Sequence, residues 1–404
     1  MTAIAEAPAV SENRVLSLIG VGHFLSHFYL LTLPPMFLVF SREFEVGFGA
    51  LGLALAGYGW VGGILQAPVG AALDKIGARQ MLAAGLALNA TAIMLIGFSD
   101  SYWQLFVLAV LAGTGNSVFH PVDYAIIAAK VREKRLGRAY SLHTFSGFAG
   151  GAAAPLVIGG LAMAFDWRMA FIIVGVCGIG AALLIFMQGD RLEGERVVKD
   201  AGPDANGKTH LSGRALLLSP PVLLYFLFLA TYGLATGAIG SQGVVAMNLM
   251  GLATEAEARG VLSAYQAAIA IGILTGGVLA ERYGRHGLTA AVALLAAAAL
   301  LLLPPVLSPT GALLFAIFIG SGFGFGIVLP ARDLMVRAIT PPGASGRVFG
   351  FVFVGLSIGS GASGPIFGQL VDAGFQNWLF PIAGILLVIA VIITTLAQMA
   401  ANKQ

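Results

Sequence analysis

The residues best suited to chemistry in this chain are polar and ionisable side chains set inside long apolar stretches. Asn116, His120 and Asp123 follow one another at helical spacing, so they are expected to form one polar stripe on an otherwise apolar helix. Pro121 lies inside the stripe and predicts a kink, because it removes a backbone hydrogen bond of the helix. Ionisable groups in apolar surroundings are costly, so the stripe is the first candidate site.

Asp123 and His120 are the leading candidates for carrying a proton. A carboxyl group in a low-dielectric environment can load and release a proton, and a neighbouring imidazole can relay it near neutral pH. In the alternative interpretation Asp123 pairs with a basic residue and only fastens its helix, because the basic run Lys130-Val-Arg-Glu-Lys-Arg135 begins a turn or two further on. The sequence leaves both interpretations open.

His23 and His27 lie one helical turn apart in the stretch GHFLSHFYLL. Metal ligands use this spacing, but two histidines do not make a site and no third ligand is evident, so no metal is predicted. The two side chains either are buried and satisfied by nearby backbone, or line a cavity where they bind substrate or share a proton.

Composition places the chain in a membrane. Of its 404 residues 58% are hydrophobic and only 10% are charged, with a mean hydropathy of +0.90, whereas a soluble domain carries roughly 25% charged residues. The single cysteine, Cys177, excludes an internal disulfide. No nucleotide-binding loop, catalytic-triad spacing or redox motif is evident, so we expect neither an enzyme nor a cofactor. The basic residues gather in loops on one side, so their excess does not indicate a nucleic-acid partner.

Twelve apolar stretches are long enough to cross a bilayer, which takes about 20 residues each. In the first half of the chain they are predicted at 15–40, 49–72, 80–98, 102–129, 138–164 and 168–188. In the second half they are predicted at 215–250, 258–281, 287–306, 311–338, 346–371 and 377–400.

The distribution of basic residues predicts the orientation. Of the 22 Lys and Arg residues, only Arg42, Arg168 and Arg259 fall on the side opposite to the N-terminus. By the positive-inside rule both termini are therefore cytoplasmic, in a multi-pass protein of a bacterial-type plasma membrane. The first residues have no basic region ahead of an apolar core, so no cleavable signal peptide is expected.

The chain divides into two related halves. The polar segment 189–213 is predicted to be a cytoplasmic linker between six-helix bundles at 1–188 and 214–404. A shift of 209 residues places Pro121 on Pro330 and Arg138 on Arg347, together with three further glycine matches. Parallel repeats of this kind are typical of transporters whose site lies between the halves, near the middle of the membrane.

Two glycine-containing loops carry a family resemblance. The stretch GAALDKIGAR at 70–79 resembles the signature loop between the second and third helices of the major facilitator superfamily, and GVLAERYGR at 277–285 resembles its copy in the second half. The resemblance covers essentially the whole chain. It implies an all-α integral membrane fold of twelve helices in two pseudo-symmetric bundles, which move by alternating access.

Both loops are expected to take part in gating the cytoplasmic side. Their glycines allow tight turns, and their carboxylates can face a helix N-terminus or a basic group of the other half. The alternative is a plain solvated turn. The residues assigned to gating are Gly70, Asp74, Gly77, Arg79, Gly277, Glu281, Arg282, Gly284 and Arg285.

Arg332 and Asp333 follow Pro330 within the stretch LPARDLMVR. Arg332 is the repeat partner of Asp123, so one hypothesis is a salt bridge between the halves that forms and breaks during transport. A second is that Arg332 binds an anionic substrate through its fork of donors. A third is that the two adjacent residues satisfy each other locally.

A narrower resemblance concerns the first half. GTGNSVFHP at 113–121, Asp123 and the following GRAYSL are similar to the fosmidomycin-resistance branch, which contains drug and small-molecule exporters driven by proton antiport. His143 and the glycines after it partly resemble the glycine–proline motif of antiporters, although Ala154 stands where a glycine is usual. His143 itself faces either the cavity or the core. An arginine common in proton-coupled members is missing from VLAVLAG at 107–113, so a proton must use other groups.

These observations predict a proton-coupled efflux transporter for a small drug-like or anionic molecule. Uptake or facilitated diffusion of an organic acid anion is the alternative, motivated by the histidines and Arg332. The expected partners are a small-molecule substrate and the lipid bilayer, and the protein is expected to be a monomer. Groups expected to line the cavity between predicted helices 1, 4, 7 and 10 are His23, His27, Asn116, His120, Tyr232 and Gln266.

Overall fold

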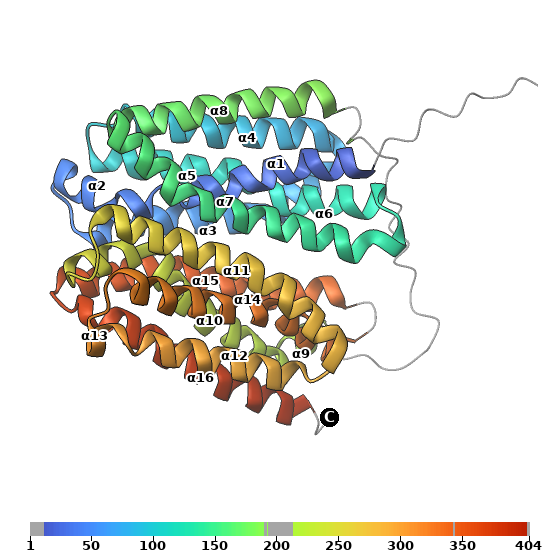
Figure 1. Ribbon diagram of the computed structural model, residues 1–404. Helices are drawn as coiled ribbons and strands as arrows, with labels where there is room; N and C mark the ends of the chain where they lie inside the picture. The colour runs from blue at the N-terminus through green and yellow to red at the C-terminus, as the bar shows by residue number, and fades with distance from the viewer. Residues whose placement is uncertain (1–11, 190–191, 193–212, 342–343, 402–404) are drawn as a thin grey trace, which may run out of the picture.

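A computed structural model describes residues 12–189, 192, 213–341 and 344–401 (Figure 1). The predicted linker at 189–213 lies almost entirely outside the described residues, as does most of the segment before the first span. The domain boundaries placed there therefore stay a prediction.

The described chain is helical throughout, and twelve of its segments are long and apolar enough to cross a membrane. This confirms the predicted fold class, with span ends shifted by a few residues. The N-terminal half contains α1 (Glu12–Leu30), η1 (Pro34–Met36), α2 (Phe37–Phe44), α3 (Phe48–Ile76), α4 (Ala78–Ile96), α5 (Tyr102–Asn116), α6 (Phe119–Lys130), η2 (Glu133–Arg135), α7 (Leu136–Ala164) and α8 (Trp167–Gln188). The C-terminal half contains α9 (Gly213–Leu217), α10 (Pro220–Leu249), α11 (Glu255–Tyr283), α12 (His286–Leu301), α13 (Pro304–Leu307), α14 (Gly311–Ala338), α15 (Ser345–Asp372), η4 (Gln376–Trp378) and α16 (Leu379–Ala401).

The two halves lie side by side, with helices α1–α8 in one layer and α9–α16 in the other (Figure 1). Within the halves the main packing pairs are α4 with α8, α1 with α7, α10 with α15, α11 with α14, α10 with α16 and α12 with α14. Between the halves α3 packs on α15 and α7 packs on α11. We call the end that carries α2 and α13 the distal end, and the end where α1 begins and α16 finishes the proximal end (Figure 1).

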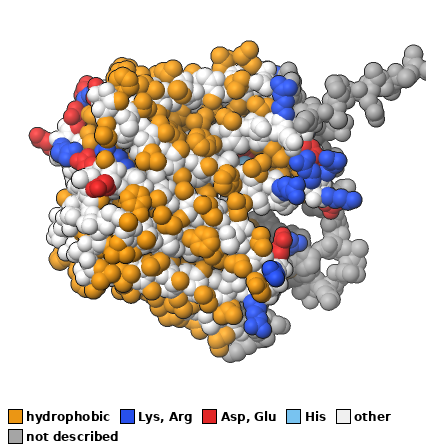
Figure 2. Space-filling view, viewed as in Figure 1, with side chains coloured by type: hydrophobic (Ala, Val, Ile, Leu, Met, Phe, Trp, Pro, Cys, Tyr) orange, Lys and Arg blue, Asp and Glu red, His pale blue; other side chains and the backbone are white. Residues whose placement is uncertain are grey.

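The side chains are sorted as a membrane requires. On the face shown in Figure 2 apolar side chains cover the broad middle, while charged side chains gather at the two ends. Lipid cannot hydrogen-bond to backbone groups, so spans built from helices satisfy most of their backbone internally. The sequence pattern and the three-dimensional surface therefore agree on a twelve-span membrane protein.

The predicted kink near Pro121 appears as a break in the helix. The chain turns at 117–118, between α5 and α6, and Pro121 lies in the first turn of α6. Proline has no backbone N–H to donate to the carbonyl four residues earlier, which makes this the natural place for the break. Its repeat partner Pro330 lies inside the unbroken helix α14. The two halves therefore differ in the region that carries their ionisable residues.

Close contact of α3 with α15 depends on glycine at the crossing. A Cβ atom added to Gly52 would lie 2.1 Å from the carbonyl carbon of Gly364, which is far inside a van der Waals contact. Small residues allow helix backbones to approach in this way in lipid. The contact between the two halves therefore leaves no room for a methyl group at this position.

We expect Gly52→Ala to lower the stability of the protein and Gly59→Ala on the same helix not to. A Cβ at Gly59 meets nothing within 4 Å, so that control gains about 0.5–1 kcal/mol from the helix propensity of alanine. The measurement is the thermal unfolding midpoint of both variants in one detergent. Equal midpoints would contradict the close approach of α3 and α15.

Candidate functional site

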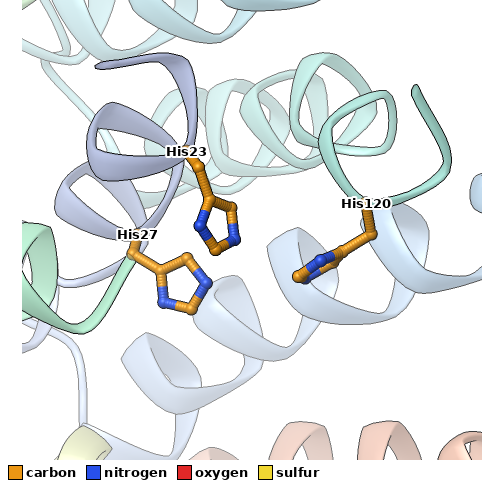
Figure 3. Close-up of side chains that lie close together, drawn as sticks. All are labelled: His23, His27 and His120. Atoms are coloured by element: carbon orange, nitrogen blue, oxygen red, sulfur yellow. The ribbon is translucent and has the colours of Figure 1, made fainter. Parts of the chain in front are cut away.

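Four of the five histidines in the described part of the chain lie together in the N-terminal half. His23 and His27 project from α1, and His120 projects toward them from α6 (Figure 3). The ring centroids of His23 and His27 are 4.7 Å apart, and that of His120 is 5.2 Å from His23 and 6.2 Å from His27. His143 of α7 stacks on His23 with 3.6 Å between ring centroids. We call His23, His27 and His120 the histidine cluster.

One hydrogen bond fixes the tautomer of His23. Its Nδ1 lies 2.7 Å from the backbone carbonyl oxygen of His143. A carbonyl only accepts hydrogen bonds, so Nδ1 carries a proton and donates, and in the neutral ring Nε2 keeps its lone pair. The side chain is 2% exposed, and Nε2 has no partner in the described part of the chain. His23 thus presents a buried, unpaired acceptor.

Asp123 pairs with a histidine and not with a residue of the basic run 130–135. Its Oδ2 lies 2.9 Å from Nε2 of His143, and both side chains are almost completely buried. Among the described residues Oδ1 of Asp123 and Nδ1 of His143 have no hydrogen-bond partner. The carboxyl group therefore lies at membrane depth with a single imidazole as its partner.

Two arginines of the basic run after α6 pair with Glu12. Arg132 donates to Glu12 with 2.7 Å between Nε and Oε1, and Arg135 also pairs with Glu12. The hydrogen bond that Arg132 donates to the Glu12 carboxylate raises the pKa of the guanidinium. These contacts tie the start of α1 to the turn before α7. These two arginines therefore do not provide the basic partner that was considered for Asp123, which pairs with His143.

Arg332 is buried in α14 and pairs with its neighbour. Its Nε donates to Oδ1 of Asp333 at 2.9 Å, and its guanidinium lies over the ring of Phe353 at 4.9 Å. Nη1 has no partner among the residues that the structure describes. The structure thus contains the local pair, and Asp123 is bound to His143 instead of Arg332. The ring of Tyr124 lies 6.0 Å from that of His120 and 5.3 Å from that of His143.

The other residues predicted to line the cavity are spread over three places. Asn116 accepts a hydrogen bond from Asn89 of α4 at 3.4 Å, so the turn at 117–118 separates it from the side of His120 and Asp123. Tyr232 donates to the carbonyl of Phe325, between α10 and α14. Gln266 lies at the interface of α7 and α11, on the C-terminal side.

The predicted gating loops form tight turns at the proximal end. Gly77 and Gly284 have φ angles of +92° and +61°, which glycine adopts without strain. Arg79 donates to the carbonyl of Phe186 at 2.6 Å and lies over its ring, within the N-terminal half. The segment Glu281–Arg285 is exposed. The side chain of Asp74 is outside the described residues, and the gating role of both loops stays a prediction.

A polar closure at the distal end joins the two halves, and sequence reasoning missed it. The carboxylate of Asp372, at the end of α15, accepts hydrogen bonds from the backbone N–H groups of Phe48 at 2.7 Å and Gly49 at 2.8 Å. These are the first residues of α3, whose own N-cap Gly47 supplies no side chain. One half thus caps a helix of the other. In the sequence this contact is indicated only by Asp372 itself, which follows an apolar stretch. Nothing in the sequence indicates which helix it caps.

Further polar contacts complete the closure. Arg259 of α11 donates to the carbonyl of Pro35 at 3.0 Å, and Glu255 pairs with both Arg259 and Arg42. Gln242 of α10 donates to the carbonyl of Phe48 at 3.2 Å. These contacts between the halves all lie at the distal end. The structure is therefore closed at the distal end.

Twelve spans in two halves, joined through one end and carrying ionisable groups at membrane depth, define a membrane transporter. The chain belongs to the Major Facilitator Superfamily, whose family model matches residues 19–256 and 243–403. This is a family of transporters and not of enzymes, as the sequence predicted.

The relatives agree with this assignment. The chain is 25% identical over 375 residues to the uncharacterized MFS-type transporter YfnC of Bacillus subtilis (strain 168), covering 91% of this chain and 89% of that protein. It is 24% identical over 377 residues to the Fosmidomycin resistance protein of Escherichia coli (strain K12), covering 92% and 89%. It is 26% identical over 313 residues to the Multidrug resistance protein MdtH of Sodalis glossinidius (strain morsitans), covering 76% and 73%.

Solved structures share the fold. A bacterial homolog of the human lysosomal transporter Spinster, in an inward-facing and occupied conformation, has a TM-score of 0.77 at 17% identity, over 96% of this chain and 97% of that one. The nucleoside transporter NupG has a TM-score of 0.76 at 15% identity, over 95% and 99%.

The distal closure generates a prediction. Asp372→Ala removes a helix cap that exists only while the distal end is closed, so the closed state should lose about 1–2 kcal/mol relative to the open one, a population shift of roughly 5–30-fold. Asp166→Ala is the matched control, because Asp166 caps α8 within one half by accepting from the N–H of Met169 at 2.7 Å.

The measurement is the distance between spin labels by pulsed electron paramagnetic resonance. The labels are placed at Asp100→Cys and Ala256→Cys, one in each half at the distal end, after Cys177→Ser removes the only native thiol. Asp372→Ala should increase the share of long distances and Asp166→Ala should not. Identical distributions in both variants would show that the cap does not hold the distal end closed.

Proposed function

We propose that this transporter exports a small drug-like or anionic molecule in exchange for protons, by alternating access of a site between its two halves. The observation that carries the proposal is Asp123, a carboxyl group buried at membrane depth whose described partner is the imidazole of His143. The proton is the coupling ion in this proposal, and no cofactor is needed.

Asp123 is suited to carrying a proton because its surroundings hold no fixed counter-charge in the described part of the chain. Burying an ionised carboxylate without a cation is expensive, whereas a protonated one can donate its own hydrogen bond. His143 keeps the carboxyl group in place through its Nε2. Exchange of the proton when the site opens to water would couple its movement to that of the substrate.

Two relatives favour export over uptake. The names Fosmidomycin resistance protein and Multidrug resistance protein MdtH belong to proteins that are similar to this chain over most of its length. Resistance to a drug is what an exporter confers. Together with the buried carboxyl group, this supports proton-coupled efflux.

Uptake or facilitated diffusion of an organic acid anion is the second candidate. Arg332 favours it, because the unpartnered Nη1 of this buried guanidinium can donate to a carboxylate. If the anion crosses by facilitated diffusion alone, an imposed pH gradient would not drive its accumulation.

We further propose that the protein lies in a bacterial inner membrane as a monomer, with both termini in the cytoplasm. The excess of Lys and Arg at the proximal end supports this orientation. The closed distal end then faces the outside of the cell.

The test is proton movement in proteoliposomes that contain a pH-sensitive dye. Fosmidomycin, short carboxylates and hydrophobic drugs are added outside, to wild type, Asp123→Asn and Glu133→Gln. Glu133 is an exposed carboxylate of the turn η2 and serves as the control. We expect one substrate class to trigger a pH change in wild type and Glu133→Gln, and the change to fall at least tenfold in Asp123→Asn.

Substrate exchange without a gradient separates coupling from structure. Asp123→Asn keeps the shape of the side chain, so it should still exchange labelled substrate across the membrane at near the wild-type rate. An unchanged pH signal in Asp123→Asn would reject Asp123 as the proton carrier. Substrate flux without any proton signal in wild type would favour the diffusion mechanism.

A further inference from the structure

We infer that the histidine cluster, His23, His27 and His120, binds one divalent transition-metal ion of the zinc, nickel and cobalt type. The three imidazoles each offer a nitrogen, and these nitrogens all lie within 4.8 Å of one another. The proposed function does not need this metal, so the inference goes beyond it.

The local structure brings the three residues together from two helices. His23 and His27 are separated by one turn of α1 and lie on one side of it, as two zinc ligands on a helix often do. The break between α5 and α6 turns α6 so that His120 faces α1 (Figure 3). The sequence offered no evident third ligand because nothing in the spacing relates position 120 to positions 23 and 27.

The hydrogen bond of His23 is that of a metal ligand. Histidines that bind metals generally donate their other ring N–H to a backbone carbonyl or a carboxylate, which fixes the tautomer and directs the lone pair. His23 donates from Nδ1 to the carbonyl of His143, and its Nε2 is buried without a described partner. A buried acceptor without a hydrogen bond is costly. A metal ion would satisfy it.

The distances fit a site that contracts slightly around its ion. Metal–nitrogen bonds of about 2.0–2.1 Å in a tetrahedral site place the ligand nitrogens roughly 3.3 Å apart. The nitrogens of the cluster, within 4.8 Å of one another, need to move about 1 Å or more. Rotations about side-chain bonds of His27 and His120 can supply this, since both are only partly buried.

The same partial exposure gives the ion an access route and an open position. Three protein ligands leave at least one coordination site of a four-coordinate ion for water or another ligand. Three neutral imidazoles leave its double positive charge uncompensated, so an anionic ligand is favoured at that position. A metal ion held here would therefore favour the binding of an anionic molecule at its open position.

The experiment is Zn²⁺ titration of the full-length protein in detergent, purified with an affinity tag that contains no histidine. We expect one Zn²⁺ per chain by calorimetry, and three imidazole nitrogens at about 2.0–2.1 Å by X-ray absorption. His27→Gln and His120→Gln should each weaken the affinity at least tenfold, because each removes one ligand.

His286→Gln is the matched control. His286 begins α12, away from the cluster, and has an unpartnered Nδ1 among the described residues. It should leave the affinity within about twofold of wild type. The variants at His27 and His120 concern partly buried side chains, and their thermal unfolding without metal should match that of wild type. His23→Gln is a less direct test, because this side chain is buried and its replacement changes the packing of the interior as well as the ligand set.

The inference is wrong if wild type binds Zn²⁺ no more tightly than a variant with all three cluster histidines replaced, or if His286→Gln weakens binding as much as His120→Gln. Binding is measured at equilibrium without a membrane or gradient. Zn²⁺ binding in a protein that moves no proton would support the metal site and reject the proposed function. Proton-coupled export by a protein that binds no Zn²⁺ would do the reverse.

Discussion

The structure depends on the cost of leaving a polar group without a partner where water is excluded. Helices satisfy most of the backbone inside the membrane, and the charged side chains on the face shown in Figure 2 lie mainly at the two ends. The exceptions are few and specific: the histidine cluster, the pair Asp123–His143 and the pair Arg332–Asp333. Each leaves at least one buried polar atom unpartnered among the described residues. These are the places where a proton, an ion or a substrate can complete the structure.

The two halves are held together by helix packing and by polar contacts at one end. Their contact combines a close approach of backbones at Gly52 and Gly364 with polar contacts at the distal end. Asp372 caps α3 only while the halves are joined. A single cap is worth about 1 kcal/mol, so such contacts can break and form again within a transport cycle.

The two repeated halves have similar helices, but their equivalent ionisable residues have different partners. Asp123 and Arg332 occupy equivalent positions in the two halves, yet the first is bound by a histidine of another helix and the second by its own neighbour. Pro121 follows a break between two helices, whereas Pro330 lies in a continuous one. The N-terminal half therefore gathers the groups that can exchange a proton or hold a metal, and the C-terminal half presents a buried cation.

The sequence by itself determined the twelve spans and the fold class, because hydropathy over about 20 residues is a local property that the bilayer selects directly. It also identified nearly every ionisable residue at membrane depth. Only the tertiary structure decided the partners, since these depend on the rotation and packing of helices far apart in the chain. His120 joins His23 and His27, Asp123 binds His143, and Asn116 faces α4 because the chain turns at 117–118. Asp372 reaches the other half for the same reason: a helix end exposes unpaired N–H groups, but only packing brings a carboxylate to them.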